Sequence, residues 1–69
     1  MNDLLFRQKV KSSGYKWKYI SEKLGVSESA LIKKRKGMIP YKVPEINLIV
    51  DILGLTANER DAIFGLKSS

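Results

Sequence analysis

The chain has 69 residues and contains neither cysteine nor histidine. A chain this short holds one small domain, residues 1–69. Without these two residue types it has no disulfide framework, no thiolate zinc site and no histidine general base. We therefore expect an intracellular protein that is not an enzyme and that binds no metal and no cofactor. The longest apolar runs are three residues, so we expect no membrane span.

The net charge of +6 is distributed unevenly along the chain. Residues 1–42 carry 11 Lys or Arg against 3 acids, a net charge of +8, whereas residues 43–69 carry 2 against 4, a net charge of −2. A basic half of this kind favours a polyanionic partner, with nucleic acid preferred over a membrane surface. The alternative is that the lysines only keep a small protein soluble.

Hydrophobic periodicity and the positions of glycine and proline predict five short helices and no strand. The expected ranges are 3–12, 17–24, 28–36, a helix with Pro44 as its first residue that continues to Gly54, and a last helix after Thr56. Asn2, Ser27 and Thr56 are the expected N-caps. The expected apolar anchors of the last two helices are Ile46, Ile49, Val50, Leu53, Ile63, Phe64 and Leu66.

The second and third predicted helices, 17–24 and 28–36, are separated by only three residues. So short a link forces the two helices to cross steeply, which is the geometry of a helix-turn-helix. This geometry needs a small residue at the crossing, a glycine in the turn and apolar residues that hold the second helix. The residues at these positions are Ser21, Gly25, Val26, Ala30 and Leu31.

The stretch from Trp17 to Gly37, WKYISEKLGVSESALIKKRKG, resembles the helix-turn-helix of phage repressor and Cro-like (lambda-repressor-like) regulators. Its most specific part is LGVSESAL, residues 24–31, and the likeness extends over about residues 6–64. The resemblance implies an all-α, compact bundle of four to five short helices with a helix-turn-helix at about 17–36. It also implies a transcriptional regulator of phage origin that acts in the bacterial cytoplasm, at the nucleoid.

The resemblance assigns residues 28–36 to a recognition helix that lies in the major groove of double-stranded DNA. The implied contact residues are Trp17, Lys18, Ser27, Glu28, Ser29, Ile32, Lys33, Lys34, Arg35 and Lys36. We expect Lys16, Lys18 and the basic run 33–36 to neutralise phosphates, and Glu28, Ser29, Ile32 and Lys33 to discriminate bases.

Three positions depart from the family pattern. Arg35 stands where Leu or Ile normally anchors the recognition helix, so we expect this helix to use Met38 and Ile39 instead. Lys16 replaces the usual Thr or Ser N-cap, at a cost of about 1 kcal/mol of helix stability. Trp17 replaces a glutamine and, with Tyr15 and Tyr19, is expected to cover the core; the alternative is a platform for stacking bases.

Two residues on the presumed DNA face leave a second function open. Glu28 is an acid that phosphates would repel, and an exposed Ile32 is typical of a protein interface. The chain also has the size of small modulator-of-repression proteins, which are thought to bind a phage repressor. The alternative function is therefore an antirepressor that binds a helix-turn-helix repressor through its recognition-helix face. A homodimer is a further open alternative, with Ile63, Phe64 and Leu66 near its interface.

Overall fold

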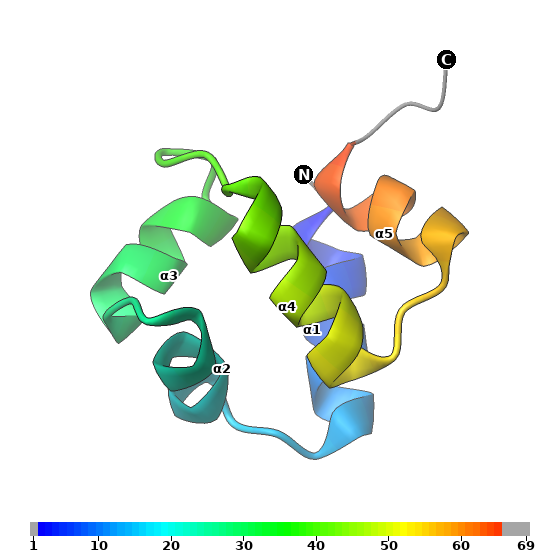
Figure 1. The fold of residues 1–69 in the computed structure, drawn as a ribbon, viewed down its shortest axis with the longest axis horizontal. Coiled ribbons are helices and arrows are strands. Elements are labelled where there is room, and N and C mark those ends of the chain that lie inside the picture. Colours follow the sequence, from blue (N-terminus) through cyan, green and yellow to red (C-terminus); the bar gives the residue numbers. More distant parts are fainter. Residues whose placement is uncertain (1, 66–69) are drawn as a thin grey trace.

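The computed structural model describes residues 2–65, which fold into a bundle of short helices (Figure 1). The helices are α1 (Asp3–Ser13), α2 (Trp17–Leu24), α3 (Glu28–Arg35), α4 (Val43–Leu53) and α5 (Ala57–Phe64). Residues 2–65 contain no strand. The all-α bundle of short helices that the sequence predicts is confirmed.

α4 is the central helix of the bundle, and it contacts α1, α2 and α5. In Figure 1, α1 passes behind α4, α5 lies on one side of this pair, and α2 and α3 lie on the other. α3 packs mainly on α2 and is far from α5. This arrangement leaves one long side of α3 at the surface.

A single hydrophobic core lies where α1, α2, α4 and α5 meet. Phe6, Ile49 and Ile63 are each 0% exposed. The other buried members are Val10, Ile20, Leu24, Leu31 and Leu55, and Leu5, Trp17, Val26, Tyr41, Val50, Leu53 and Phe64 pack around them. The expected anchors Val50, Leu53 and Phe64 therefore border the core, and Leu66 lies outside the described residues.

The three predicted N-caps are confirmed by their hydrogen bonds. Asn2 Oδ1 accepts from the Leu5 N–H at 3.1 Å, and Ser27 Oγ accepts from the Ala30 N–H at 3.0 Å. Thr56 forms a capping box with Glu59, with bonds of 2.9 and 3.1 Å. These bonds satisfy amide groups that a helix start otherwise leaves unpaired. Lys16, at the start of α2, makes no side-chain cap bond.

The link between α2 and α3 follows directly from its sequence. Gly25 takes a left-handed conformation (φ 71°), which glycine adopts without steric cost. The Val26 N–H then donates to the Ser21 carbonyl at 3.0 Å. Ser21 itself is 2% exposed, so the small residue expected at this position is buried.

Three helix ends differ from the prediction by one residue. α1 continues to Ser13, and α3 ends at Arg35 with Lys36 as its C-cap. α4 begins at Val43, so Pro44 is its second residue and not its first. Proline is tolerated there because the first amides of a helix have no partner within the helix.

Candidate nucleic-acid interface

One side of α3 faces solvent and carries half of the predicted contact residues. The exposed residues on this side are Glu28, Ser29, Ile32 and Lys33, followed by Lys36 at the C-cap. Ile32 is 46% exposed, whereas Leu31 beside it is 2% exposed. Residues three or four apart lie on the same face of a helix. The exposed residues therefore share one face of α3, and Leu31 lies on the opposite, buried face. The structure therefore brings these five predicted residues together at the surface.

The start of α3 adds a second feature to this side. Ser27 is exposed and caps the helix, so the positive end of the α3 dipole lies at the surface next to Glu28. An acid in the first turn is favourable for the helix, whatever it binds. Glu28 thus has a structural role that is compatible with either of the two functions left open by the sequence.

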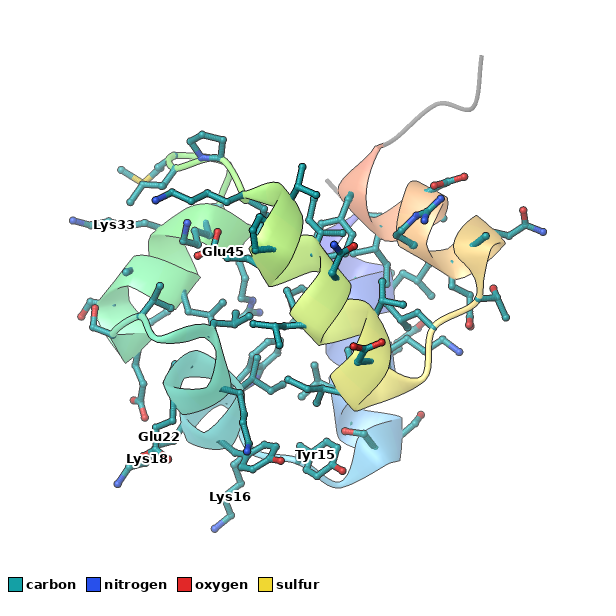
Figure 2. The ribbon with its side chains drawn as sticks, viewed as in Figure 1. Tyr15, Lys16, Lys18, Glu22, Lys33 and Glu45 are labelled. Atoms are coloured by element: carbon teal, nitrogen blue, oxygen red, sulfur yellow. The ribbon has the colours of Figure 1, made fainter. Side chains whose placement is uncertain are left out.

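Exposed lysines at the start of α2 extend the cationic surface. Lys16 and Lys18 are both exposed, and Figure 2 shows their side chains pointing away from the bundle beside α2, as that of Lys33 does beside α3. With Lys36 they make four exposed lysines that no ion pair within residues 2–65 engages. Lys23 of α2 is exposed as well, and its ammonium lies 5.5 Å from the centroid of the Tyr19 ring.

Lys34 does not belong to this surface. Its side chain is 6% exposed, and its ammonium donates to Glu45 Oε1 at 3.0 Å and to the Pro40 carbonyl at 3.2 Å. It also lies over the Tyr41 ring, 5.8 Å from the centroid. The prediction that Lys34 contacts phosphate is wrong, because this side chain points inward from α3 to α4.

The Glu45 side chain makes hydrogen bonds to residues at both α3 and α4 (Figure 2). The same Oε1 that accepts from Lys34 also accepts from the Lys42 N–H at 2.8 Å, at the start of α4. Burial disfavours the charged carboxylate, but the bonds from Lys42 and Lys34 and the charges of both lysines outweigh it. The pKa of Glu45 is therefore lowered from its ordinary value.

Arg35 is also engaged within the fold. Its guanidinium forms a two-point contact with the Asp3 carboxylate, at 2.9 and 3.3 Å, and lies 3.9 Å from the Trp17 ring centroid. The structure does not leave Arg35 free for the predicted phosphate contact, because Asp3 of α1 already pairs with it. The expectation that Met38 helps to anchor the helix is also wrong, since Met38 is 68% exposed. Ile39 is half-buried and borders a hollow beside Tyr41.

Asp3 and Glu45 are the residues that sequence reasoning missed. A signal for Asp3 was present: a helix that has Arg where it needs an inward anchor also needs an acid inside the fold. The sequence does not show which acid that is, because Asp3 lies 32 residues from Arg35.

The three aromatic residues near the start of α2 divide into two groups. Trp17 is half-buried and packs edge-on against Phe6, with ring centroids 5.2 Å apart, so its expected role in covering the core is confirmed. Tyr15 and Tyr19 instead stack on each other at 4.7 Å and are 42% and 37% exposed. The expectation that they cover the core is wrong.

A small hollow lies between Trp17 and the exposed side of α3. Its volume is about 230 Å³, and it is lined by Trp17, Glu28, Leu31, Ile32 and Arg35. Most of its surface is apolar, although Glu28 and Arg35 are among its lining residues. A space of this size and character accepts a methyl group or one apolar side chain.

None of the helices in residues 2–65 is long and apolar enough to cross a membrane.

The comparisons with other proteins add no further assignment. Comparison with protein-family models, with curated proteins and with solved structures finds no match to this chain.

Proposed function

We propose that this chain is a double-stranded-DNA-binding transcriptional regulator of the repressor and Cro type, with α2 and α3 as its helix-turn-helix. The observation that carries the proposal is the exposed side of the α2–α3 pair. It presents Lys16, Lys18, Lys33 and Lys36, and the other exposed residues of α3 are Glu28, Ser29 and Ile32. The proposed site of action is the nucleoid in the bacterial cytoplasm.

The four lysines supply the phosphate contacts in this proposal, and the exposed residues of α3 supply the base contacts. Ser29 hydrogen-bonds to a base edge, Glu28 accepts from a cytosine amino group, and Ile32 contacts a thymine methyl. The number of phosphate contacts is smaller than the sequence alone suggests, because Lys34 and Arg35 are already paired. This reduction gives the proposal a numerical test.

The test is a titration of a randomised duplex pool at several salt concentrations. Four phosphate contacts give a slope of log affinity against log salt of about −3 to −4 per bound chain. Lys33→Ala weakens binding and changes the slope by about one. Lys11→Ala is the matched control, because it removes an exposed lysine of α1. Absence of duplex binding at low salt refutes the proposal.

A second function is favoured by the hollow beside Trp17. An apolar hollow bordered by Glu28 and the exposed Ile32 fits an apolar side chain and a nearby Arg or Lys of a protein partner. In this second proposal the chain is an antirepressor whose α3 binds another helix-turn-helix repressor. The same surface then modulates DNA binding without reading an operator.

Glu28→Gln and Ile32→Ala separate the two functions. On DNA, Glu28→Gln removes an acid from beside the phosphates, so non-specific affinity rises. At a protein interface the same change removes an acceptor and weakens the complex. Ile32→Ala costs about 2 kcal/mol or more if Ile32 is a central interface anchor, and less if it meets one methyl group. Both variants are measured against duplex DNA and against a phage helix-turn-helix repressor, with sizing to detect dimers.

A further inference from the structure

α3 is unusual in how it is attached to the rest of the bundle. Leu31 is its one buried apolar side chain, and the other inward residues of its second half are Lys34 and Arg35. A helix of eight residues with one buried apolar anchor gains little from hydrophobic burial. Its orientation must therefore depend on the contacts of these two charged side chains.

The Arg35 contact reaches across the fold to the first turn of α1. Arg35 Nε donates to Asp3 Oδ1 at 2.9 Å and a terminal nitrogen donates to Oδ2 at 3.3 Å. The Arg35 side chain is 18% exposed and that of Asp3 is 33% exposed. Two parallel bonds between planar groups restrict rotation as well as distance, so this pair fixes a direction for the last turn of α3.

Trp17 makes the contact a junction of three helices. The guanidinium of Arg35 lies 3.9 Å from the centroid of the indole of Trp17, and the indole in turn packs on Phe6, which is 0% exposed. Arg35 is thus held between an acid of α1 and an aromatic ring of α2. Stacking of this kind is favourable for a guanidinium and is lost in part with lysine.

We infer that Asp3, Arg35 and Trp17 form a latch that sets the orientation of α3, and that Asp3 and Arg35 are positioning residues for whatever the exposed side of α3 binds. The part of this inference that concerns DNA rests on the proposed function. In the sequence, Trp17 lies between Lys16 and Lys18, and Arg35 lies between Lys33 and Lys36. The latch therefore fixes the position of the lysines of α2 relative to those of α3.

The chain contains a matched control for the latch. Arg7 also pairs with Asp3, at 3.2 Å, but it does so within α1 and is 55% exposed. Arg7→Gln therefore removes one positive partner of Asp3 without touching α3. Arg35→Lys and Asp3→Asn each break the two-point contact, and Arg35→Met keeps an unbranched side chain against Trp17 while removing the charge.

The first experiment measures hydrogen exchange of the α3 amides and the fluorescence of Trp17, the only tryptophan in the chain. We expect Arg35→Lys and Asp3→Asn to speed exchange in α3 by about tenfold and to shift the emission of Trp17, while Arg7→Gln does neither. The double variant should show no larger change than either single one. Additive changes, or equal changes in Arg7→Gln, overturn the latch. If Arg35→Lys does not fold, Arg35→Met replaces it in the same comparison of the two single variants with the double variant.

The second experiment measures duplex binding at a temperature where circular dichroism shows every variant folded. We expect the latch variants to lose about tenfold in affinity and to lose sequence discrimination, with Arg7→Gln within about twofold of the parent chain. Latch variants that match Arg7→Gln overturn the positioning role. A parent chain that binds no duplex refutes the proposed function alone, because the exchange measurements still decide whether the latch exists.

Discussion

α3 and α4 lie in the same small bundle but are held there by different forces. α4 buries Ile46 and Ile49 and packs Val50 and Leu53 against the core. α3 buries Leu31 and otherwise depends on Lys34 and Arg35, which pair with acids of α4 and α1. The difference shows how a small domain can leave one side of a helix exposed and still fix the direction of that helix.

The two kinds of attachment respond differently to mutation. Apolar burial has no preferred direction and falls with the area removed from water. A buried ion pair adds little net stability while it is intact, yet loss of one partner is costly because a charge remains buried. The position of α3 is therefore sensitive to single substitutions of acids that lie on other helices.

The largest expected effect follows from breaking the Lys34–Glu45 pair. Glu45→Gln leaves the Lys34 charge without a carboxylate and weakens the start of α4, so we expect a loss of about 3 to 5 kcal/mol in the free energy of unfolding. In a domain this small, a loss of that size removes most of the stability. Urea unfolding followed by circular dichroism measures it, with Asp51→Asn, at an exposed acid of α4, as the control.

A second substitution sharpens this test. Lys34→Met in the Glu45→Gln background removes the buried charge, so we expect it to recover much of the lost stability. If the double variant is no more stable than Glu45→Gln alone, the loss comes from the start of α4 and not from the ion pair.

The crossing of α2 and α3 is expected to be the next most sensitive position. Ser21 is 2% exposed, so Ser21→Leu places a large side chain at a buried position. We expect the overpacking to lower the free energy of unfolding by about 1 to 3 kcal/mol. Thermal melting measures the change. Ser12→Leu, at an exposed position of α1, is the matched control. Equal melting temperatures for Ser21→Leu and the parent chain contradict the close approach of the two helices.

Acid should loosen α3 before α4, with a smaller effect on total stability. The pKa of Glu45 in the folded chain is below its ordinary value of 4.5. Its ionised form therefore stabilises the fold fully above about pH 4.5, and this contribution is lost as the pH falls through the lowered folded-state pKa. The pKa of Glu59 is lowered as well, by bonds from Lys9 and Thr56, so the same pH range weakens the contact between α1 and α5.

Hydrogen exchange as a function of pH, corrected for the intrinsic exchange rate, measures this order. We expect protection of the α3 amides to fall below pH 4.5 while the middle of α4 stays protected. Loss of protection in both helices at the same pH contradicts the distinction between them.

The smallest expected effect is a gain in stability. The Tyr41 hydroxyl is buried and, among residues 2–65, has no hydrogen-bond partner; burial raises its pKa above the ordinary value. Tyr41→Phe keeps the edge contacts with Phe6 and Phe64 and removes the unpaired group. We expect stabilisation of about 1 kcal/mol, measured as a higher melting temperature. A clear loss of stability indicates a bond from this hydroxyl in solution.

Much of the fold was predictable from local rules. Asn2, Ser27 and Thr56 are recognisable as caps because a cap bonds to an amide two or three residues away, and glycines at helix ends mark where each helix stops. The buried position of Ser21 followed from the short link after α2. These features depend on neighbours along the chain, which the sequence displays directly.

The candidate site was predictable only in part. The exposed residues of α3 follow from helical spacing. The basic run 33–36, however, looks like one cationic patch in the sequence, although two of its four side chains point inward in the structure. Their partners are 11 and 32 residues away. Pairings over such distances depend on how the helices pack, which no local pattern encodes. Tyr15 and Tyr19 are only four residues apart and stack on each other. Whether such a pair faces the core or the solvent depends on how α2 packs, which the local sequence does not show.

The inward orientation of Lys34 and Arg35 has a consequence for how this domain can change. The groups that hold α3 lie on its inner side. The outer residues Glu28, Ser29, Ile32 and Lys33 therefore contribute little to the fold, apart from the favourable charge of Glu28 at the start of the helix. The proposed binding residues and the residues that hold the fold therefore lie on opposite sides of the same eight-residue helix. A library randomised at these four outer positions should retain the fold in most of its members, which makes the domain a scaffold on which new specificities can be selected.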